Sequence, residues 1–403
     1  MANVVVGITG GIAAYKSASL IRLVSEASNS VQVVATVNAQ RFIGQITLEA
    51  LSKNPVEVVD PDLYTDVDQV KHITIAKSAD CIVVAPATAS FIAKIAAGIA
   101  DDLLTSTVLA ATCPVLIAPA MHTEMWQNAA TVSNIATLKQ RGIEIIEPAV
   151  GRLTGADTGV GRLAEPEEIL ARVKRTLAGG LLKGFRVLVT TGGTRERIDA
   201  ARYVGNYSSG KQGFAFARAA FELGADVKVI AANAKSSDSN TYSVEEVSTA
   251  AELETKIMSH INDFDILIMA AAVADYRPKT AFPGKLKRSE LGSEISIELV
   301  ANEDVLAAVT TRLRADGSNA TVVGFAAEAS ADLVNLGLEK MKAKGCAFMF
   351  VNDIASGEVF GSDDNSGVLV YPAGSQPVAG SKIEVARTVL RLVATKVIKA
   401  KGK

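Results

Sequence analysis

The residue types best suited to binding a phosphate occur in two glycine-rich turns. The first turn, Thr9-Gly10-Gly11, follows an apolar run at residues 4–6, and the second, at residues 190–194, follows a similar run at residues 187–189. A buried strand that ends in such a turn and continues into a helix presents backbone N–H groups to a phosphate. Two such turns far apart in one chain predict two nucleotide-handling domains, so a bifunctional enzyme is the first hypothesis to test.

Hydroxyl groups extend this prediction in the first half of the chain. Thr88 and Ser90 follow an apolar run at residues 81–85, where hydroxyls and helix-opening N–H groups can hold a phosphate. The pair Gly10-Gly11 lacks the GxGxxG spacing of dinucleotide-binding folds, and by itself a purely structural turn explains it equally well. Together, these residues favour a mononucleotide such as FMN over NAD.

Strands and helices alternate along both halves, which predicts two doubly wound α/β domains with parallel sheets. In the first half, strands are expected at residues 4–8, 31–37, 81–85, 115–118 and 144–146, with helices at 13–26, 90–97 and 131–141. In the second half, strands are expected at 186–190, 227–231 and 266–270, with a helix at 213–223. A short linker containing glycine predicts domains at residues 1–180 and 185–403.

The composition excludes several classes of protein. The chain has 403 residues, enough for two domains, and its net charge of −2 leaves no basic surplus for nucleic acid or an anionic membrane. Cys81, Cys113 and Cys346 lie far apart without CxxC spacing, which fits a reducing cytoplasm. Residues 3–7 lead directly into a strand, so no signal peptide is expected. The uncharged residues 103–121 include polar residues and a proline, which favours buried core over a membrane span.

Three segments of the first half, residues 7–17, 86–104 and 119–126, resemble the flavin-dependent phosphopantothenoylcysteine decarboxylases, a homo-oligomeric group. The whole chain resembles the fused bacterial phosphopantothenoylcysteine decarboxylase/phosphopantothenate–cysteine ligase family of coenzyme A synthesis. The resemblance implies two Rossmann-like domains, a flavodoxin-like flavoprotein domain followed by a ligase domain. It also implies a cytoplasmic homo-oligomer built from decarboxylase trimers and ligase dimers. The residues that would bind FMN are Gly10, Gly11, Ser17, Thr88 and Ser90.

His72, one of three histidines, matches the catalytic histidine of that family. A lone histidine is more often a structural residue, but the flanking sequence favours the catalytic role here. The resemblance implies that the substrate's cysteinyl side chain is oxidised by the flavin to a thioaldehyde, which allows CO2 to leave, and that the product is then reduced. A group that titrates near neutrality is suited to moving protons in these steps.

Two departures from the family pattern bear on the decarboxylase site. His122 follows Met121 where the family usually has an asparagine that is expected to hold the substrate carboxylate, and a histidine can donate the same hydrogen bond. In a glycine-rich segment at residues 151–162, predicted to be a mobile lid, Gly155 stands where many relatives have a cysteine thought to assist the reductive step. Either another proton donor substitutes, with Asp157 the nearest in sequence, or the reductive half-reaction is weak.

In the second half, small polar residues and glycines at residues 205–213 open an alanine-rich helix, and Lys211 adds a positive charge. Such a helix start is an anion site, with an ordinary capped helix as the alternative. The segment resembles the phosphopantothenate-binding loop of the ligase, in which Asn206 matches the residue expected to hold an acyl-cytidylate intermediate. The substrate-binding residues of this loop would be Ser208, Ser209, Gly210 and Lys211.

The resemblance also implies a CTP site further along the chain. Lys340 and Lys344 are four residues apart and share one helix face, which is either solvated or bound to a triphosphate. The residues expected there, with Lys285 in a catalytic role, are Asp275, Lys285, Lys287, Glu303, Asp304, Val305, Leu306, Phe325, Lys340 and Lys344. The lysines and a Mg2+ ion, whose ligands the sequence does not identify, would offset charge on the phosphates.

These parts predict an enzyme that joins 4'-phosphopantothenate to L-cysteine with CTP and decarboxylates the product to 4'-phosphopantetheine with FMN. A two-domain nicotinamide dehydrogenase is one alternative, but neither turn has the GxGxxG spacing that it requires. The other alternative is a ligase whose first domain binds flavin but is weakly active or regulatory, because some relatives of this fold are phosphatase-inhibiting subunits. His72 argues against a binding-only domain, which has no need for a base.

Overall fold

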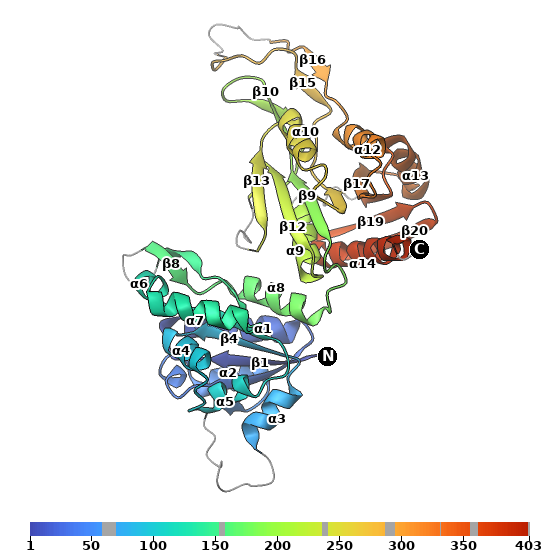
Figure 1. Ribbon diagram of the computed structural model, residues 1–403. Helices are drawn as coiled ribbons and strands as arrows, with labels where there is room; N and C mark the ends of the chain where they lie inside the picture. Colours follow the sequence, from blue (N-terminus) through green and yellow to red (C-terminus); the bar gives the residue numbers. More distant parts are fainter. Residues whose placement is uncertain are drawn as a thin grey trace. The chain divides into compact units, whose positions relative to one another are not determined.

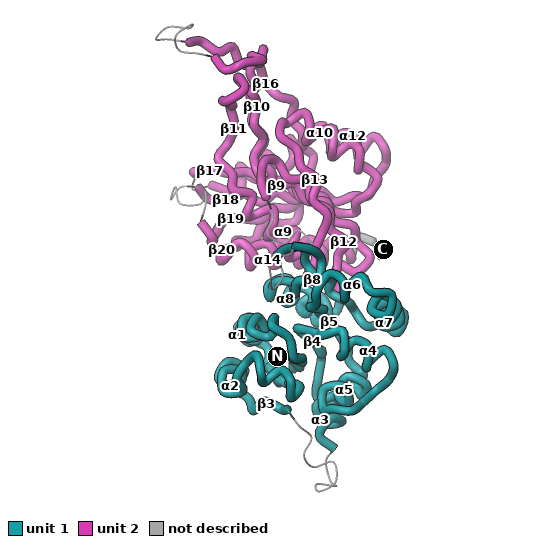
Figure 2. The backbone as a smooth tube through the Cα atoms, turned by 90° about the vertical axis from the view of Figure 1, so that its left-hand side faces the viewer, with its two compact units in different colours: residues 1–179 teal, residues 180–403 magenta. Residues whose placement is uncertain are grey.

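The chain folds as two units, residues 1–179 and residues 180–403, each with its own sheet and hydrophobic core (Figure 2). The computed structural model describes residues 1–58, 70–152, 158–235, 241–286, 295–330, 332–354 and 362–401, with side chains to residue 398. The two units are described separately below, because each positions its own set of candidate residues.

Unit 1 contains a six-stranded, fully parallel sheet in the order β3-β2-β1-β4-β5-β6. Its strands are β1 (Asn3–Ile8), β2 (Ser30–Ala35), β3 (Val56–Glu57), β4 (Cys81–Ala87), β5 (Val115–Pro119) and β6 (Glu144–Ile145). The predicted doubly wound, Rossmann-like fold is confirmed. The strand order is that of the Rossmann fold and not the flavodoxin order, in which the second strand lies at the edge, so the finer expectation of a flavodoxin-like sheet is corrected.

Helices cover both faces of this sheet (Figure 1), which explains the uninterrupted apolar runs in its strands. The side chains of Val4, Val6 and Ile8 pack with one group of helices and Val5 packs with the other. The first group is α1 (Lys16–Glu26), α2 (Gln45–Ser52) and α8 (Pro166–Leu177). The second group is α3 (Lys71–Ser78), α4 (Ala89–Ala97), α5 (Leu103–Leu109) and α7 (Ala129–Gln140).

The uncharged stretch at residues 103–121 is divided between α5 and β5, as predicted, and both elements lie in the core of unit 1. Among the residues that the structure describes, no helix is both long enough and apolar enough to cross a membrane.

Unit 2 repeats the topology of unit 1 and extends it. Its eight-stranded sheet has the order β13-β12-β9-β14-β17-β18-β19-β20, in which the first six strands are parallel and the last two are antiparallel additions. The strands are β9 (Arg186–Gly192), β12 (Asp226–Ala232), β13 (Ser243–Val247), β14 (Ile266–Met269), β17 (Thr321–Glu328), β18 (Phe348–Asp353), β19 (Asp364–Tyr371) and β20 (Gly374–Ser381). The two similar turns in the sequence therefore follow the equivalent central strand of two similar sheets.

The helices of unit 2 form two groups. One group packs on the apolar cluster that includes Leu267, and consists of α10 (Ala250–Ser259), α12 (Val305–Ala315) and α13 (Leu333–Lys344). The other pair is α9 (Lys211–Glu222) and α14 (Lys382–Lys401), which contact each other and are joined by an ion pair between Glu222 and Arg387 of 2.7 Å.

Two short antiparallel ribbons complete unit 2. They are β10 (Arg195–Arg197) with β11 (Tyr203–Gly205), and β15 (Tyr276–Pro278) with β16 (Leu299–Ala301). The ribbons contact each other and project away from the eight-stranded sheet (Figure 1).

Candidate active sites

The first candidate site lies where the strand order of unit 1 reverses, at the carboxyl ends of β1 and β4. Ligands of doubly wound sheets bind in the crevice outside such a switch point. The hydroxyl of Thr9, directly after β1, donates to the carbonyl of Pro86 (2.8 Å) and accepts from the N–H of Thr88 (3.0 Å). Thr88 in turn caps the first turn of α4 by accepting from the N–H of Phe91. The two predicted segments are therefore joined at one point.

Gly10 and Gly11 occupy positions with different requirements. A Cβ atom on Gly10 would lie 2.5 Å from the Cβ of Asn38, so the turn after β1 approaches the segment after β2 too closely for a side chain. A Cβ atom on Gly11 would have only one neighbour within 4 Å, the Cγ2 of Thr88 at 3.6 Å. Gly10 is thus required by packing, whereas Gly11 borders the crevice.

The other residues expected to bind FMN are placed differently. The side chain of Ser17 is buried, and its hydroxyl donates to the carbonyl of Ala85 (2.7 Å), which fastens α1 to β4. Ser90 is exposed on the first turn of α4. No sequence pattern singles out Thr36, yet its Oγ1 atom is buried directly after β2 and has no hydrogen-bond partner in the described part of the chain. An unpaired buried hydroxyl beside a glycine turn and a helix start fits a phosphate-bearing cofactor.

His72 lies at the start of α3, where an ion pair between Lys71 and Glu57 ties the helix to the end of β3. The histidine therefore lies on the side of the sheet where the strands have their carboxyl ends, as the crevice does. Because β3 is two strands away from β1, the two strands are separated by about 10 Å.

Met121 and His122 follow β5 and lie under a hairpin. The hairpin is β7 (Ala149–Arg152) paired with β8 (Thr158–Arg162), which together form the base of the predicted lid. The N–H of Met121 donates to the carbonyl of Gly161 (2.9 Å), and a Cβ on Gly161 would lie 2.2 Å from the Met121 carbonyl oxygen. His122 is exposed at the start of α6 (Thr123–Trp126). The two residues of the predicted lid that were expected to contact the substrate, Gly155 and Asp157, lie outside the described residues.

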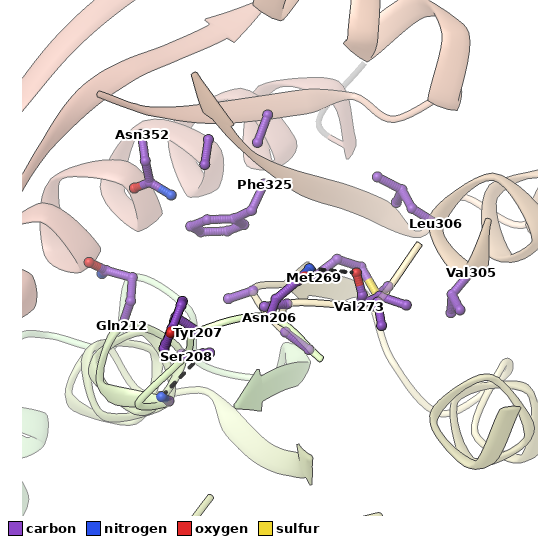
Figure 3. Close-up of a pocket in the computed structure, with 18 of the residues that line it drawn as sticks. Asn206, Tyr207, Ser208, Gln212, Met269, Val273, Val305, Leu306, Phe325 and Asn352 are labelled. Carbon is purple, nitrogen blue, oxygen red and sulfur yellow. Dashed lines mark hydrogen bonds between the residues drawn. The ribbon is translucent and has the colours of Figure 1, made fainter. Parts of the chain in front are cut away.

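The second candidate site is a cavity of about 830 Å³ in unit 2 (Figure 3). It lies at the carboxyl ends of β14, β17 and β18 and beside the start of α9, at the switch point of the second sheet. The residues predicted from the sequence that line it are Asn206, Ser208, Ser209, Gly210, Lys211, Asp275, Glu303, Asp304, Val305, Leu306, Phe325, Lys340 and Lys344. Lys285 is not among the lining residues, and Lys287 lies outside the described residues.

The loop before α9 is held against the sheet by close backbone contacts. Gly210 caps α9 with a φ of +75°, a conformation that favours glycine, and its carbonyl accepts from the hydroxyl of Thr191 (2.7 Å). A Cβ on Gly213 would lie 2.3 Å from that same hydroxyl oxygen, so α9 begins in direct contact with β9. The side-chain amide of Asn206 donates to the carbonyl of Val273 (3.0 Å), which joins this loop to the segment after β14 (Figure 3).

Cationic side chains line the cavity, and the structure pairs them with carboxylates or carbonyls. Lys211 pairs with Asp363 at 2.7 Å, Lys340 with Glu328, and Lys344 with Asp304. The amine of Lys382, which the sequence reasoning missed, is buried and donates to the carbonyls of Ser362 and Asp364. Burial lowers the pKa of Lys382, as does the neighbouring charge of Lys211. The cavity lining thus brings Lys211, Lys340, Lys344 and Lys382 together with the carboxylates of Asp275, Glu303 and Asp304, and the lysines are the groups that can contact a polyanionic ligand.

The segment that carries Lys285 is anchored by Asp199. The carboxylate of Asp199 accepts from the N–H groups of Ala201 and Arg202 (2.7 Å each) and of Leu286 (3.1 Å), and from the Arg202 guanidinium (3.0 Å). Burial of Asp199 acts to raise its pKa, but these hydrogen bonds outweigh it and lower the pKa to about 2. Lys285 therefore lies on a firmly held turn beside the ribbons and outside the cavity lining.

The described residues contain no group of three or more His, Cys, Asp and Glu side chains that could hold a metal ion. The carboxylates of Asp275, Glu303 and Asp304 line the cavity without forming such a group.

The two units match two protein families. Residues 1–178 match the flavoprotein family, and residues 182–397 match the family described as the DNA/pantothenate metabolism flavoprotein C-terminal domain. The fold and sites therefore define a flavoprotein joined to a pantothenate-metabolism domain.

Similar full-length proteins narrow this class further. The chain is 47% identical to the coenzyme A biosynthesis bifunctional protein CoaBC of Mycobacterium tuberculosis (98% of this chain, 96% of that one) and 39% identical to that of Vibrio vulnificus (98% and 97%). A solved C-terminal domain of a CoaBC protein is 28% identical, covers 55% of this chain and all of its own, and has a TM-score of 0.45. The chain belongs to this family of bifunctional coenzyme A biosynthesis enzymes, with a decarboxylase half and a ligase half.

Proposed function

We propose that unit 2 joins 4'-phosphopantothenate to L-cysteine with CTP, and that unit 1 decarboxylates the product to 4'-phosphopantetheine with FMN. The observation that carries the substrate assignment is the cavity of unit 2, which gathers residues expected for the acid and residues expected for CTP. These residues come from five separate stretches of sequence, so their convergence does not follow from any local pattern.

The ligase reaction has a physical rationale in this cavity. A carboxylate is a poor electrophile, so one of its oxygens first attacks the α-phosphorus of CTP, forming an acyl-cytidylate and releasing pyrophosphate. The amine of cysteine then attacks the acyl carbon, CMP leaves, and the amine loses a proton. Lys340 and Lys344 offset the charge that moves between the phosphates, and Asn206 holds the intermediate. Positioning and charge stabilisation carry the acceleration, without an assigned general base.

Mg2+ enters this proposal as a partner of the CTP phosphates. Magnesium in proteins commonly keeps several waters and is held by one or two carboxylates together with substrate phosphates. The carboxylates of Asp275 and Glu303 in the cavity supply suitable oxygen ligands. The proposal does not include a metal site formed by protein side chains alone.

In unit 1, the residues around the switch point are suited to holding FMN: Gly11, Thr36, Thr88 and Ser90 offer backbone and hydroxyl groups at one end of the sheet. Bound FMN supplies the oxidation and reduction that decarboxylation of a cysteinyl group requires. His72 moves protons, and His122 donates a hydrogen bond to the substrate carboxylate. The hairpin over Met121 limits access of water.

A second candidate is a ligase with a flavin-binding but weakly active or regulatory first unit. The observation that favours it is the glycine at position 155, where many relatives carry a cysteine. A homo-oligomer of decarboxylase trimers and ligase dimers, located in the cytoplasm, completes the main proposal and rests on the family resemblance.

Mass spectrometry of the purified chain, supplied with 4'-phosphopantothenate, cysteine, CTP and Mg2+, tests the proposal after its visible spectrum has been recorded. A yellow protein that yields 4'-phosphopantetheine supports both activities. Accumulation of phosphopantothenoylcysteine supports the ligase and favours the second candidate for unit 1. Failure to consume CTP in the presence of both other substrates contradicts the ligase assignment.

A further inference from the structure

A buried asparagine connects two side chains at one end of the unit 2 cavity. Asn365, on β19, is only 6% exposed. Its amide nitrogen donates to the Oε1 atom of Gln212 (2.8 Å) and to the Oδ1 atom of Asn352 (2.8 Å). Gln212 and Asn352 lie at the same end of the cavity in Figure 3, whereas Val305 and Leu306 lie at the other end.

Matching each N–H donor with an oxygen acceptor determines the orientation of all three side-chain amides. The backbone N–H of Ser366 donates to the side-chain oxygen of Asn365 (2.9 Å), and a backbone N–H can be paired only with an acceptor. The NH2 group of Asn365 must therefore face Gln212 and Asn352. Because a side-chain amide has two N–H donors and both are used here, each partner must turn its oxygen toward Asn365.

This orientation decides what Asn352 presents to the cavity. The oxygen of Gln212 accepts from Asn365, so its NH2 group must face an acceptor on the other side. That acceptor is the carbonyl of Lys382, at 3.1 Å. The oxygen of Asn352 is occupied by Asn365, so its NH2 group is turned to the other side. In the described chain that NH2 group donates to no protein atom, although Asn352 is half-buried and lines the cavity.

We propose that Asn365 is a positioning residue that makes Asn352 present N–H donors, and not its oxygen, to an acceptor oxygen of the acid substrate. The proposal rests on the proposed ligase function. The acid is the ligand of this end of the cavity, because Gln212 belongs to the loop and helix start assigned to it, whereas Val305 and Leu306 are assigned to CTP. The acid is rich in acceptor oxygens, which an amide oxygen at this position would repel.

Asn365→Asp is the variant that tests this polarity. Aspartate has the same shape and keeps an acceptor for Ser366, but it has no N–H groups. The Asn352 amide is then expected to turn over, donate to the introduced carboxylate, and present its oxygen to the substrate. One such lost hydrogen bond corresponds to about tenfold weaker 4'-phosphopantothenate binding, measured by titration calorimetry and as KM, with the KM for CTP changed less than about twofold. Asn319→Asp makes the same chemical change at an exposed position outside the cavity and should alter neither.

A double-mutant cycle separates positioning from a general effect of the new charge. In an Asn352→Ala background, which leaves Gln212 as the remaining acceptor of the Asn365 amide, Asn365→Asp should weaken 4'-phosphopantothenate binding clearly less than it does in the wild-type chain. Full multiplication of the two effects, or unchanged binding in Asn365→Asp, overturns the proposal. If Asn365→Asp does not fold, Asn365→Ala replaces it. This variant should weaken 4'-phosphopantothenate binding several-fold when residue 352 is asparagine and much less when it is alanine. Unchanged binding in Asn365→Ala overturns the proposal. A wild-type chain that neither binds the acid nor releases CMP contradicts the proposed function instead.

Discussion

At the scale of single residues, both units depend on glycines at which no side chain fits. Gly10 in unit 1 lies against Asn38, and Gly213 in unit 2 lies against the hydroxyl of Thr191. In unit 1 the missing side chain lets the turn after β1 approach the segment after β2, and in unit 2 it lets α9 approach β9. This is a function of glycine in nucleotide-binding turns that does not require the GxGxxG spacing.

The variant Gly10→Ala tests this requirement. Its Cβ would lie 2.5 Å from the Asn38 Cβ and 2.9 Å from the Asn38 backbone carbon, so one of the two loops must move. We expect destabilisation of about 1–3 kcal/mol and a lower content of bound flavin. Thermal unfolding and visible absorbance of the purified protein measure the two effects. Gly44→Ala, whose Cβ has no neighbour within 4 Å, is the control, and full flavin content in Gly10→Ala would contradict the expectation.

At the scale of elements, α13 presents one lysine pair to the cavity and a third lysine to solvent. Lys340 and Lys344 line the cavity, whereas Lys342 is exposed and does not. The sequence alone left two interpretations of the pair, a solvated face or a triphosphate-binding face. The position of α13 places the pair at the cavity and so favours the second.

Substitution of the pair should affect CTP selectively. Because a hydrogen bond to a charged group contributes about 1.5–3 kcal/mol, Lys344→Gln is expected to raise the KM for CTP at least about tenfold, with the KM for 4'-phosphopantothenate nearly unchanged. Steady-state pyrophosphate release at varied concentrations of each substrate provides the measurement. Lys342→Gln removes the same charge from the solvent side of α13. An equal effect of both variants would point to net charge and against a specific contact.

The turn held by Asp199 should lose its anchor in acid. Its pKa is lowered from 3.8 to about 2, so the ionised carboxylate stabilises the folded turn above about pH 4, and this stabilisation disappears as the pH falls toward 2. Asp199→Asn removes the charge at every pH. Amide hydrogen exchange at Leu286 should be faster in the variant at pH 5–7 and should converge with wild type near pH 2. Asp226→Asn, an exposed position on β12, should show no such difference. A constant difference across this range would show that ionisation of Asp199 is not responsible.

At the scale of the whole molecule, the elements that recur were predictable and the contacts between distant elements were not. The apolar runs before Thr9 and Thr191 predicted the central strands of both sheets, because buried parallel strands read as continuous hydrophobic segments. In each sheet, the turns after parallel strands lie at the carboxyl ends of those strands, which is where doubly wound sheets bind their ligands. The convergence of the predicted ligase residues on one cavity follows from the same rule and from the family resemblance.

The residues that sequence reasoning missed share a physical cause. Asn365 and Lys382 reach the cavity only because β19 and β20 add to the sheet in the antiparallel direction and return the chain to the start of α9. No local periodicity or spacing encodes that approach. Lys285 is a different case: the family resemblance implied a catalytic role, and the hydrogen bonds of Asp199 hold its turn outside the cavity lining, so that role stays a prediction.

Two sheets, two cores and two crevices predict that the activities can be removed one at a time. His72→Asn should abolish CO2 release from phosphopantothenoylcysteine while CTP-dependent ligation continues, because the histidine lies in unit 1 and the cavity is formed entirely by unit 2. Asn206→Asp should impair formation of the acyl-cytidylate and leave both bound flavin and decarboxylation intact. CO2 release and CMP release, each measured from its own substrate, distinguish the four outcomes. Loss of both activities in either variant would show that the two sites are not separable.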